Sequence, residues 1–258
     1  MEQILTGKSA FVTGGGQGIG RGIVEQLAKQ GARVTVAEIN RKTGKATAAA
    51  LSDAGYSVEF TGVDITSEEN IKQGIAEHVE RFGTMDILVN NAGRNQHFDA
   101  STMSAEEWQA SMNLNLRGAW LCSKHVLPSM AQREHGVIIN IASVHATMTL
   151  HNNFPYNVAK SGLLGLTRSL ALDWGHKNIR VVAVSPGYIR TQPVVDGFQQ
   201  ADNPEKEEKR IADLHPLKRI GSPGDVGSLV AYLASDGAGF ITGTEIVIDG
   251  GISARYAD

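Results

Sequence analysis

Short runs of apolar, often β-branched residues alternate with longer stretches of helical pattern along most of the chain. The short runs predict seven strands, over residues 9–13, 33–39, 57–64, 87–91, 137–143, 180–185 and 245–249. The longer stretches predict helices, one ending near residue 30 and others over 42–53, 67–82, 105–130 and 156–174. Repeated strand–helix–strand units imply an α/β fold whose parallel sheet is covered by helices on both faces.

No Pro-, Gly- or Ser-rich linker and no shift in composition divides the chain, so we expect residues 1–258 to form a single domain. With 41% hydrophobic and 20% charged residues, the chain can bury a sizeable core without a disulfide or a metal to hold it. The one stretch without a regular pattern covers about residues 189–219, which are rich in charge and are bracketed by Pro193 and Pro216.

Charge and cysteine usage narrow the function classes. The net charge is −3 and no long basic run occurs, which argues against a nucleic-acid-binding protein. The single cysteine, Cys122, excludes an intrachain disulfide and a multi-cysteine metal cage. The first residues lack the apolar core of a signal peptide, and no apolar run is long enough to cross a bilayer. We therefore expect a cytoplasmic protein that engages neither nucleic acid nor membrane.

A glycine-rich segment follows the first predicted strand. It reads Thr13-Gly14-Gly15-Gly16-Gln17-Gly18-Ile19-Gly20, a T-G-x-x-x-G-x-G pattern. Glycines there let the backbone turn tightly and approach a pyrophosphate, and the next helix offers free N–H groups and the positive end of its dipole. A ligand-free turn is the alternative, but the place directly after the first strand favours a nucleotide site in a doubly wound, Rossmann-type sheet.

The end of the second predicted strand indicates which dinucleotide binds. Glu38 can accept hydrogen bonds from the ribose hydroxyls and repels a 2′-phosphate. Gln17 is uncharged where a reader of that phosphate needs Arg or Lys. Arg41 is a counter-signal, since it could reach a phosphate, and Glu38 could also be an ordinary surface acid. We expect NAD in preference to NADP.

Two further strand ends complete the predicted nucleotide site. Asp64 can accept a hydrogen bond from the adenine amine, and Ile65 can lie behind the ring. Asn91, Ala92 and Gly93 follow the fourth strand, where small residues let the backbone pass close to the cofactor. An asparagine-rich turn without a ligand is the alternative interpretation of this segment.

Tyr156 and Lys160 stand four residues apart in a predicted helix, which puts them on one face. A phenol has a pKa of about 10 and is a poor base at neutral pH, but a nearby cation favours the phenolate and lowers that pKa. Alone, such a pair is more typical of a lysine that packs beside a half-buried ring. The nucleotide loop upstream favours a tuned acid/base instead.

In their order and separation, these motifs closely resemble the short-chain dehydrogenase/reductase family over essentially the whole chain. The resemblance rests on Thr13-Gly14, Gly18-Ile19-Gly20, Asp64, Asn90-Asn91-Ala92-Gly93, Asn115, Ser143, Tyr156 with Lys160, and Ser185-Pro186-Gly187 with Thr191. It implies a nicotinamide-dependent oxidoreductase that transfers a hydride at a carbon bearing oxygen.

The resemblance also implies a role for each catalytic residue. Tyr156 would be the general acid/base, and Lys160 would lower its pKa and bond the nicotinamide ribose. Ser143 would hold the substrate oxygen. Asn115 would hold a water that links Lys160 to solvent, with Asn113 as a rival for that role. The remaining cofactor contacts that the resemblance implies are Pro186, Gly187, Ile189 and Thr191.

By family position, the substrate wall is unusually polar. Its candidate residues are Arg94, His97, Ser143, His145, His151 and Tyr188. Unpaired polar groups are costly in an apolar pocket, so this wall suits a polyhydroxylated substrate better than a steroid or a fatty acyl chain. The Ser143-Val144-His145 run also resembles bacterial sugar 1-dehydrogenases, which implies oxidation of an aldose at C1 to a lactone. An anionic substituent on the sugar could meet Arg94 and the histidines, although each of these side chains could instead face solvent.

Other functions and partners stay open at this point. The histidines show no ligand spacing such as H-E-x-x-H, so we expect no catalytic metal. A reductase of 3-oxoacyl thioesters on acyl carrier protein is the nearest rival, and a non-catalytic nucleotide-binding regulator is a remoter one. The resemblance implies a homotetramer and a lid over residues 189–219, which could otherwise be a solvated helix pair.

Overall fold

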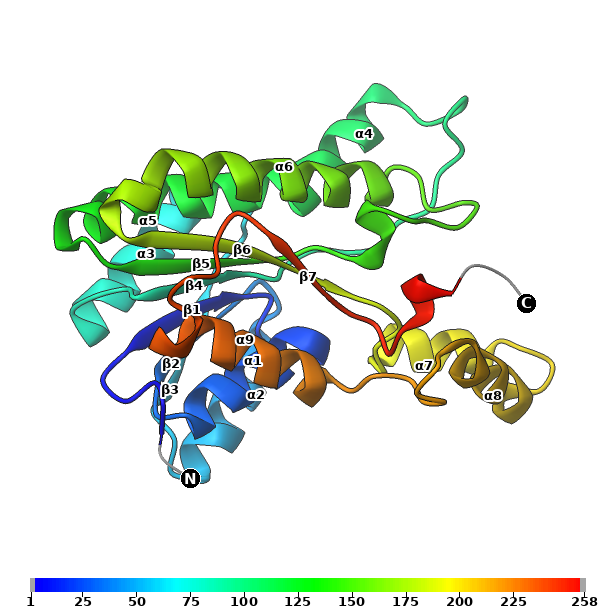
Figure 1. The fold of residues 1–258 in the computed structure, drawn as a ribbon, viewed down its shortest axis with the longest axis horizontal. Helices are drawn as coiled ribbons and strands as arrows, with labels where there is room; N and C mark the ends of the chain where they lie inside the picture. The colour runs from blue at the N-terminus through cyan, green and yellow to red at the C-terminus, as the bar shows by residue number, and fades with distance from the viewer. Residues whose placement is uncertain (1–2, 256–258) are drawn as a thin grey trace.

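A seven-stranded parallel sheet forms the centre of the computed structural model, which describes residues 3–255 (Figure 1). Its strands are β1 (Ser9–Thr13), β2 (Arg33–Glu38), β3 (Val58–Gly62), β4 (Ile87–Asn90), β5 (Gly136–Ile141), β6 (Ile179–Pro186) and β7 (Glu245–Ile248). They lie in the order β3-β2-β1-β4-β5-β6-β7, and all neighbouring pairs run parallel. The predicted α/β fold with its seven-stranded parallel sheet is confirmed.

The helices lie in two layers on either side of the sheet (Figure 1). One layer contains α1 (Gly18–Lys29), α2 (Arg41–Asp53) and α9 (Pro223–Ala234). The other contains α3 (Glu68–Phe82), α5 (Gly118–Arg133) and α6 (Tyr156–Trp174), with α4 (Ala105–Met112) beyond them. Because both faces are covered, β1, β4 and β5 are buried along their whole length, which explains their continuous apolar sequences.

The predicted helix over residues 105–130 is not one regular helix. A π-helical turn, Asn113–Arg117, separates α4 from α5, and α5 continues to Arg133. Such turns insert one residue into the hydrogen-bond ladder and change which side chains face inward. In this turn Asn115 is buried, with 2% of its surface exposed.

The sequence pattern did not locate the helices in the last third of the chain, although it left a solvated helix pair open as one interpretation of residues 189–219. The stretch predicted to be irregular holds α7 (Gln192–Gln199) and α8 (Pro204–Leu214), which project beyond the end of the sheet next to the C-terminal segment (Figure 1). Helix α9 packs against α1 and was also not predicted. Its start does carry a recognisable signal, because Ser222 and Asp225 form a capping box around Pro223.

Strand β1 lies between β2 and β4, so the strand order reverses at this place in the sheet. In open α/β sheets, ligands bind beyond the carboxyl ends of the strands at such a point. The glycine segment after β1 and Asn91 after β4 both lie there. Within residues 3–255, none of the helices has the length and apolar character needed to cross a membrane.

Candidate active site

The glycine segment forms a cradle of exposed backbone at the start of α1. Gly14 and Gly18 adopt positive φ angles of 63° and 53°, which favour glycine. A Cβ atom on Gly20 would lie 2.0 Å from the carbonyl oxygen of Gly14, so no side chain fits there. Gln17 precedes α1 in an extended conformation, and its side chain does not cap the helix. The first N–H groups of α1 therefore stay available for an anion.

Asn91 fixes the shape of this cradle. Its Nδ2 donates to the carbonyl oxygens of Thr13 (3.0 Å) and Gly14 (3.1 Å). The hydroxyl oxygen of Thr13 accepts hydrogen bonds from the backbone N–H groups of Asn91 (3.0 Å) and Ala92 (3.1 Å). Thr13 thus has a role that the sequence argument did not give it, although its place directly before Gly14 was the available signal.

On its open side, the cradle faces Thr191, which precedes α7. A Cβ atom on Gly18 would lie 3.3 Å from Cγ2 of Thr191. Ile189 is buried, and it pairs with Gly221 through an isolated parallel bridge. Pro186 ends β6, and a Cβ on Gly187 would lie 2.7 Å from Cβ of Asp249. The structure thus brings the predicted nicotinamide-side segment next to the cradle.

The ribose end of the cradle holds a buried carboxylate. Glu38 accepts hydrogen bonds from the backbone N–H groups of Gly16 (3.2 Å) and Asn40 (3.0 Å). The guanidinium of Arg41 lies close to Gly62: a Cβ atom added to this glycine would be 3.2 Å from Cζ of Arg41. An acid and a base therefore stand at adjacent strand ends.

Asp64 and Ile65 lie just beyond β3. One oxygen of Asp64 accepts from both the N–H and the hydroxyl of Thr66, at 2.8 and 2.7 Å. Ile65 is buried against Gly118, where an added Cβ would lie 2.7 Å from Cδ1 of Ile65. This contact holds the start of α5 close to the adenine side of the predicted site.

Four predicted catalytic residues come together at the carboxyl edge of the sheet. Ser143 follows β5, and its side chain hydrogen-bonds to the hydroxyl of Tyr156, the first residue of α6. Lys160 is buried one turn further along, where its Nζ donates to the carbonyl oxygen of Ile141 (2.7 Å). The same Nζ lies 5.4 Å from the centre of the Tyr156 ring.

Asn115, rather than Asn113, lies beside this group. Its Oδ1 accepts from the backbone N–H of Arg94 (2.9 Å). A Cβ on Gly93 would lie 2.8 Å from that same Oδ1 and 3.6 Å from Nζ of Lys160, so Asn115 and Lys160 converge on one glycine.

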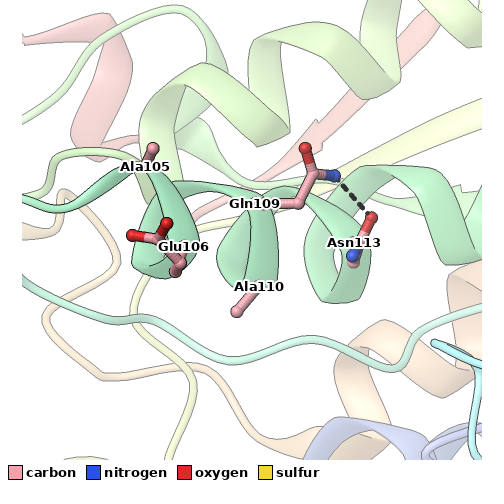
Figure 2. A pocket seen from close by; sticks show the side chains of 5 residues that line it. All are labelled: Ala105, Glu106, Gln109, Ala110 and Asn113. Carbon is pink, nitrogen blue, oxygen red and sulfur yellow. Dashed lines mark hydrogen bonds between the residues drawn. The ribbon is translucent and has the colours of Figure 1, made fainter.

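Asn113, the first residue of the π-helical turn, lies beside side chains of α4 instead. Its Oδ1 accepts from Nε2 of Gln109 (2.8 Å), and Figure 2 shows the two side chains facing one another. They line a shallow depression of about 450 Å³ with Ala105, Glu106 and Ala110. That depression contains none of the predicted catalytic residues, so we do not assign it to the active site.

The electrostatics differ from the sequence-based expectation that Lys160 lowers the pKa of Tyr156. Burial raises the pKa of Tyr156, and the hydrogen bond from Ser143 is what opposes this rise. Burial also lowers the pKa of Lys160, to about 8. The low-dielectric surroundings disfavour both charged forms, because neither group keeps its hydration. Ser143 is therefore the group that favours the phenolate in this structure.

The predicted substrate residues fall into two sets. His145 lies beside Tyr156, with ring centres 6.1 Å apart, and His97 is close enough to affect its pKa. Arg94 and His151 are exposed on neighbouring loops. Tyr188 packs its ring edge-on to His215 of the α8 end, at 5.9 Å between ring centres, and not against Tyr156. The histidine pair is thus the part of the wall nearest to the acid/base.

These residues fit a nicotinamide dinucleotide. The cradle has no room for side chains at Gly14 and Gly20, offers unpaired N–H groups for a pyrophosphate, and holds Glu38 at its ribose end. Among the described residues, no group of three or more His, Cys, Asp or Glu side chains could hold a metal ion.

Known proteins resemble the chain along nearly its whole length. Residues 14–253 match a family model described as enoyl-(acyl carrier protein) reductase. An uncharacterized oxidoreductase of Thermotoga maritima is 38% identical over 255 residues, which cover 98% of each chain. Levodione reductase of Leifsonia aquatica is 33% identical, over 98% of this chain and 96% of its own. A crystal structure described as "a putative gluconate dehydrogenase" of Agrobacterium tumefaciens has a TM-score of 0.92 and 28% identity, covering 99% of this chain and 100% of that one.

Proposed function

The chain belongs to the short-chain dehydrogenase/reductase family, and we propose that it is an NAD-dependent dehydrogenase that oxidises a sugar at C1 to the lactone. The observation that carries the choice of substrate is the polar wall against the acid/base: His145 packs edge-on to Tyr156, which is hydrogen-bonded to Ser143. Polar groups so close to the reacting atoms favour a substrate that can pair with them. A gluconate dehydrogenase, as one similar structure is described, also acts on a polyhydroxylated compound.

The side chains divide the reaction between them. When bound, the nicotinamide supplies the acceptor for the hydride that leaves the substrate carbon. Tyr156 takes the proton of the substrate hydroxyl as general base. Ser143 donates a hydrogen bond to the same oxygen as it becomes the carbonyl oxygen. Two electrons and one proton leave the carbon as hydride, and the second proton stays on Tyr156.

The proton on Tyr156 must then reach solvent. Lys160 suits this transfer because its pKa of about 8 lies near neutral pH, so it can release and regain a proton readily. Asn115 and the ammonium of Lys160 both lie close to Gly93, and Oδ1 of Asn115 accepts from the backbone N–H of Arg94. In this proposal a water held at Asn115 links Lys160 to the outside.

Reduction of 3-oxoacyl thioesters on acyl carrier protein is the second candidate. The family model that matches residues 14–253 is described as an enoyl-(acyl carrier protein) reductase, which shares the carrier-bound thioester with this candidate but not the 3-oxo group. Glu38 argues against it, because that role generally goes with NADPH, whose 2′-phosphate a carboxylate repels. The remoter alternative, a non-catalytic regulator, is set aside because the relatives are oxidoreductases.

A substrate panel tests the proposal. The purified protein is offered NAD or NADP with aldoses, polyols and secondary alcohols, and separately NADPH with a 3-oxoacyl thioester, while nicotinamide absorbance is followed. We expect reduction of NAD with aldoses. Turnover confined to the acyl thioester with NADPH refutes the proposal, and silence with every compound favours a nucleotide-binding regulator.

Glu38→Gln tests the preference for NAD. Glutamine keeps one acceptor oxygen for the Gly16 N–H, gives up the acceptor for the Asn40 N–H, and removes the charge that repels a 2′-phosphate. We expect the ratio of kcat/KM for NAD to that for NADP to fall at least about tenfold, equivalent to roughly 1.4 kcal/mol. Glu59→Gln, at an exposed acid on β3, is the matched control. An unchanged ratio in Glu38→Gln would remove Glu38 from the selectivity argument, and adding Arg41→Gln shows whether Arg41 supports the gain with NADP.

We extend the proposal to the segment 189–219, as a lid over the bound cofactor and substrate. Its helices bury only Phe198 and Ile211, so little apolar surface holds them in place. Trypsin should cut at exposed Lys206 or Lys209 in the free protein, and NAD with an aldose should slow this cleavage severalfold. Equal cleavage rates with and without the ligands would show that these helices are an ordinary solvated pair.

A further inference from the structure

Two loops, one of which lies directly before Tyr156 in the chain, pair through their backbones. The loop after β4 pairs with the segment before α6 through an antiparallel bridge between His97 and Pro155. The backbone N–H of Phe98 donates to the carbonyl oxygen of Phe154 (2.9 Å). This pairing fixes the position of His97 relative to Tyr156, although His97 belongs to a separate loop.

His145 also lies next to Tyr156. Its backbone N–H donates to Oγ of Ser143 (3.2 Å), so its position depends on a residue of the acid/base group. Its ring stands edge-on to Tyr156 and is half-buried. Nδ1 of His145 is hydrogen-bonded to the hydroxyl of Thr149 (3.0 Å). Nε2 is therefore the nitrogen that His145 can offer to a ligand.

His97 offers the same nitrogen. Its Nδ1 is hydrogen-bonded to the carbonyl oxygen of Asn152, which can only accept, so Nδ1 carries a hydrogen. When protonated, the ring presents an N–H at Nε2. Among the described residues, no other hydrogen-bond partner occupies Nε2 of His97 or of His145.

The basic side chains at this place have no acidic partner. Burial, and then the neighbouring His97, lower the pKa of His145. The exposed Arg94 adds a third basic group on the loop of His97. Within residues 3–255, no carboxylate lies within ion-pair distance of these three side chains. Asp99, the acid nearest in sequence to His97, accepts hydrogen bonds from Ser101 instead.

Resting on the proposed function, we propose that His97 and His145 bind a carboxylate of the substrate, so that the enzyme acts on sugar acids in preference to neutral sugars. A carboxylate bound beside the two Nε2 atoms accepts a hydrogen bond from each protonated ring, and its negative charge favours that protonation. It also orients the polyhydroxylated chain against Tyr156, which makes the pair a determinant of specificity and not of the chemical step.

A matched pair of substrates tests the inference: an aldose, and the uronic acid that differs from it only by a carboxylate in place of the terminal CH₂OH. We expect the wild type to show a KM at least tenfold lower for the acid. His97→Gln and His145→Gln should each raise the KM for the acid about tenfold more than they raise the KM for the neutral aldose. His97→Lys should restore the preference for the acid, and His176→Gln, in the turn after α6, is the control.

The outcomes separate the two proposals. If the wild type reduces NAD equally well with both sugars, or if the Gln variants raise both KM values alike, the carboxylate site is refuted while C1 oxidation stands. If neither sugar supports reduction of NAD, the proposed function itself fails and the inference with it. Thermal unfolding of each variant shows that it is folded.

Discussion

Tyr156→Phe lowers kcat about a thousandfold, within the range of 100- to 10,000-fold that removal of a general base produces, and leaves the Kd for NAD almost unchanged. The variant removes only the hydroxyl, which is hydrogen-bonded to Ser143 and which we assign as the base. The ring stays, so its packing with His145 and its contact with Lys160 persist. Turnover and fluorescence titration with NADH measure the two quantities separately.

Tyr232→Phe is the matched control for this result. Its hydroxyl donates to the carbonyl oxygen of Gly237 on the exposed end of α9, far along the chain from the active-site residues. We expect turnover within about twofold of the wild type there. Near wild-type turnover in Tyr156→Phe would refute its role as the base. A large loss of NADH binding would indicate that the tyrosine supports the cofactor site instead.

The pKa values of Tyr156 and Lys160 could not be predicted from the sequence, although their shared helix face could. The spacing of four residues was enough to place both on one helix face, and α6 does begin at Tyr156. The spacing says nothing about burial, which decides the pKa of both groups. Burial of Lys160 depends on β5, because the ammonium of Lys160 donates a hydrogen bond to the carbonyl oxygen of Ile141 in that strand. A contact between residues 19 apart on different elements cannot be derived from local pattern.

Secondary-structure elements also differ in how far local sequence predicts them. Buried parallel strands have continuous apolar sequences, so each of the seven could be predicted from pattern alone. Helix α8 has a highly charged sequence and buries only Ile211, so its pattern is also that of a solvated segment. The π-helical turn at Asn113–Arg117 depends on how α4 and α5 pack and not on local propensity. Its consequence for function is that it buries Asn115 next to Gly93.

The glycine cradle depends both on a local sequence pattern and on contacts from a distant residue. The glycine pattern after β1 predicted a nucleotide loop, but the contacts that shape the loop come from a residue 77 positions away, Asn91, whose amide bonds the Gly14 carbonyl. Glycine at position 20 is required by this arrangement and not by backbone dihedral angles, because Gly20 is helical and its φ is not positive. The restriction is the space that Gly14 and Asn91 occupy.

Gly20→Ala therefore abolishes most cofactor binding. The new Cβ would lie 2.0 Å from the carbonyl oxygen of Gly14 and 2.6 Å from Nδ2 of Asn91, so the loop and its amide support must move. Overpacking of this kind costs about 1–3 kcal/mol. If about 3 kcal/mol of binding free energy is lost because the NAD-bound loop is no longer favourable, Kd for NAD rises roughly a hundredfold. Gly165→Ala on α6 is the control, since a Cβ there meets nothing within 4 Å and alanine favours a helix. Calorimetric titration with NAD measures Kd, and circular dichroism separates loss of the cradle from loss of the fold.

A folded Gly20→Ala protein with wild-type affinity would mean that NAD does not bind against this loop. The nicotinamide that accepts the hydride would then have to bind at another place on the molecule.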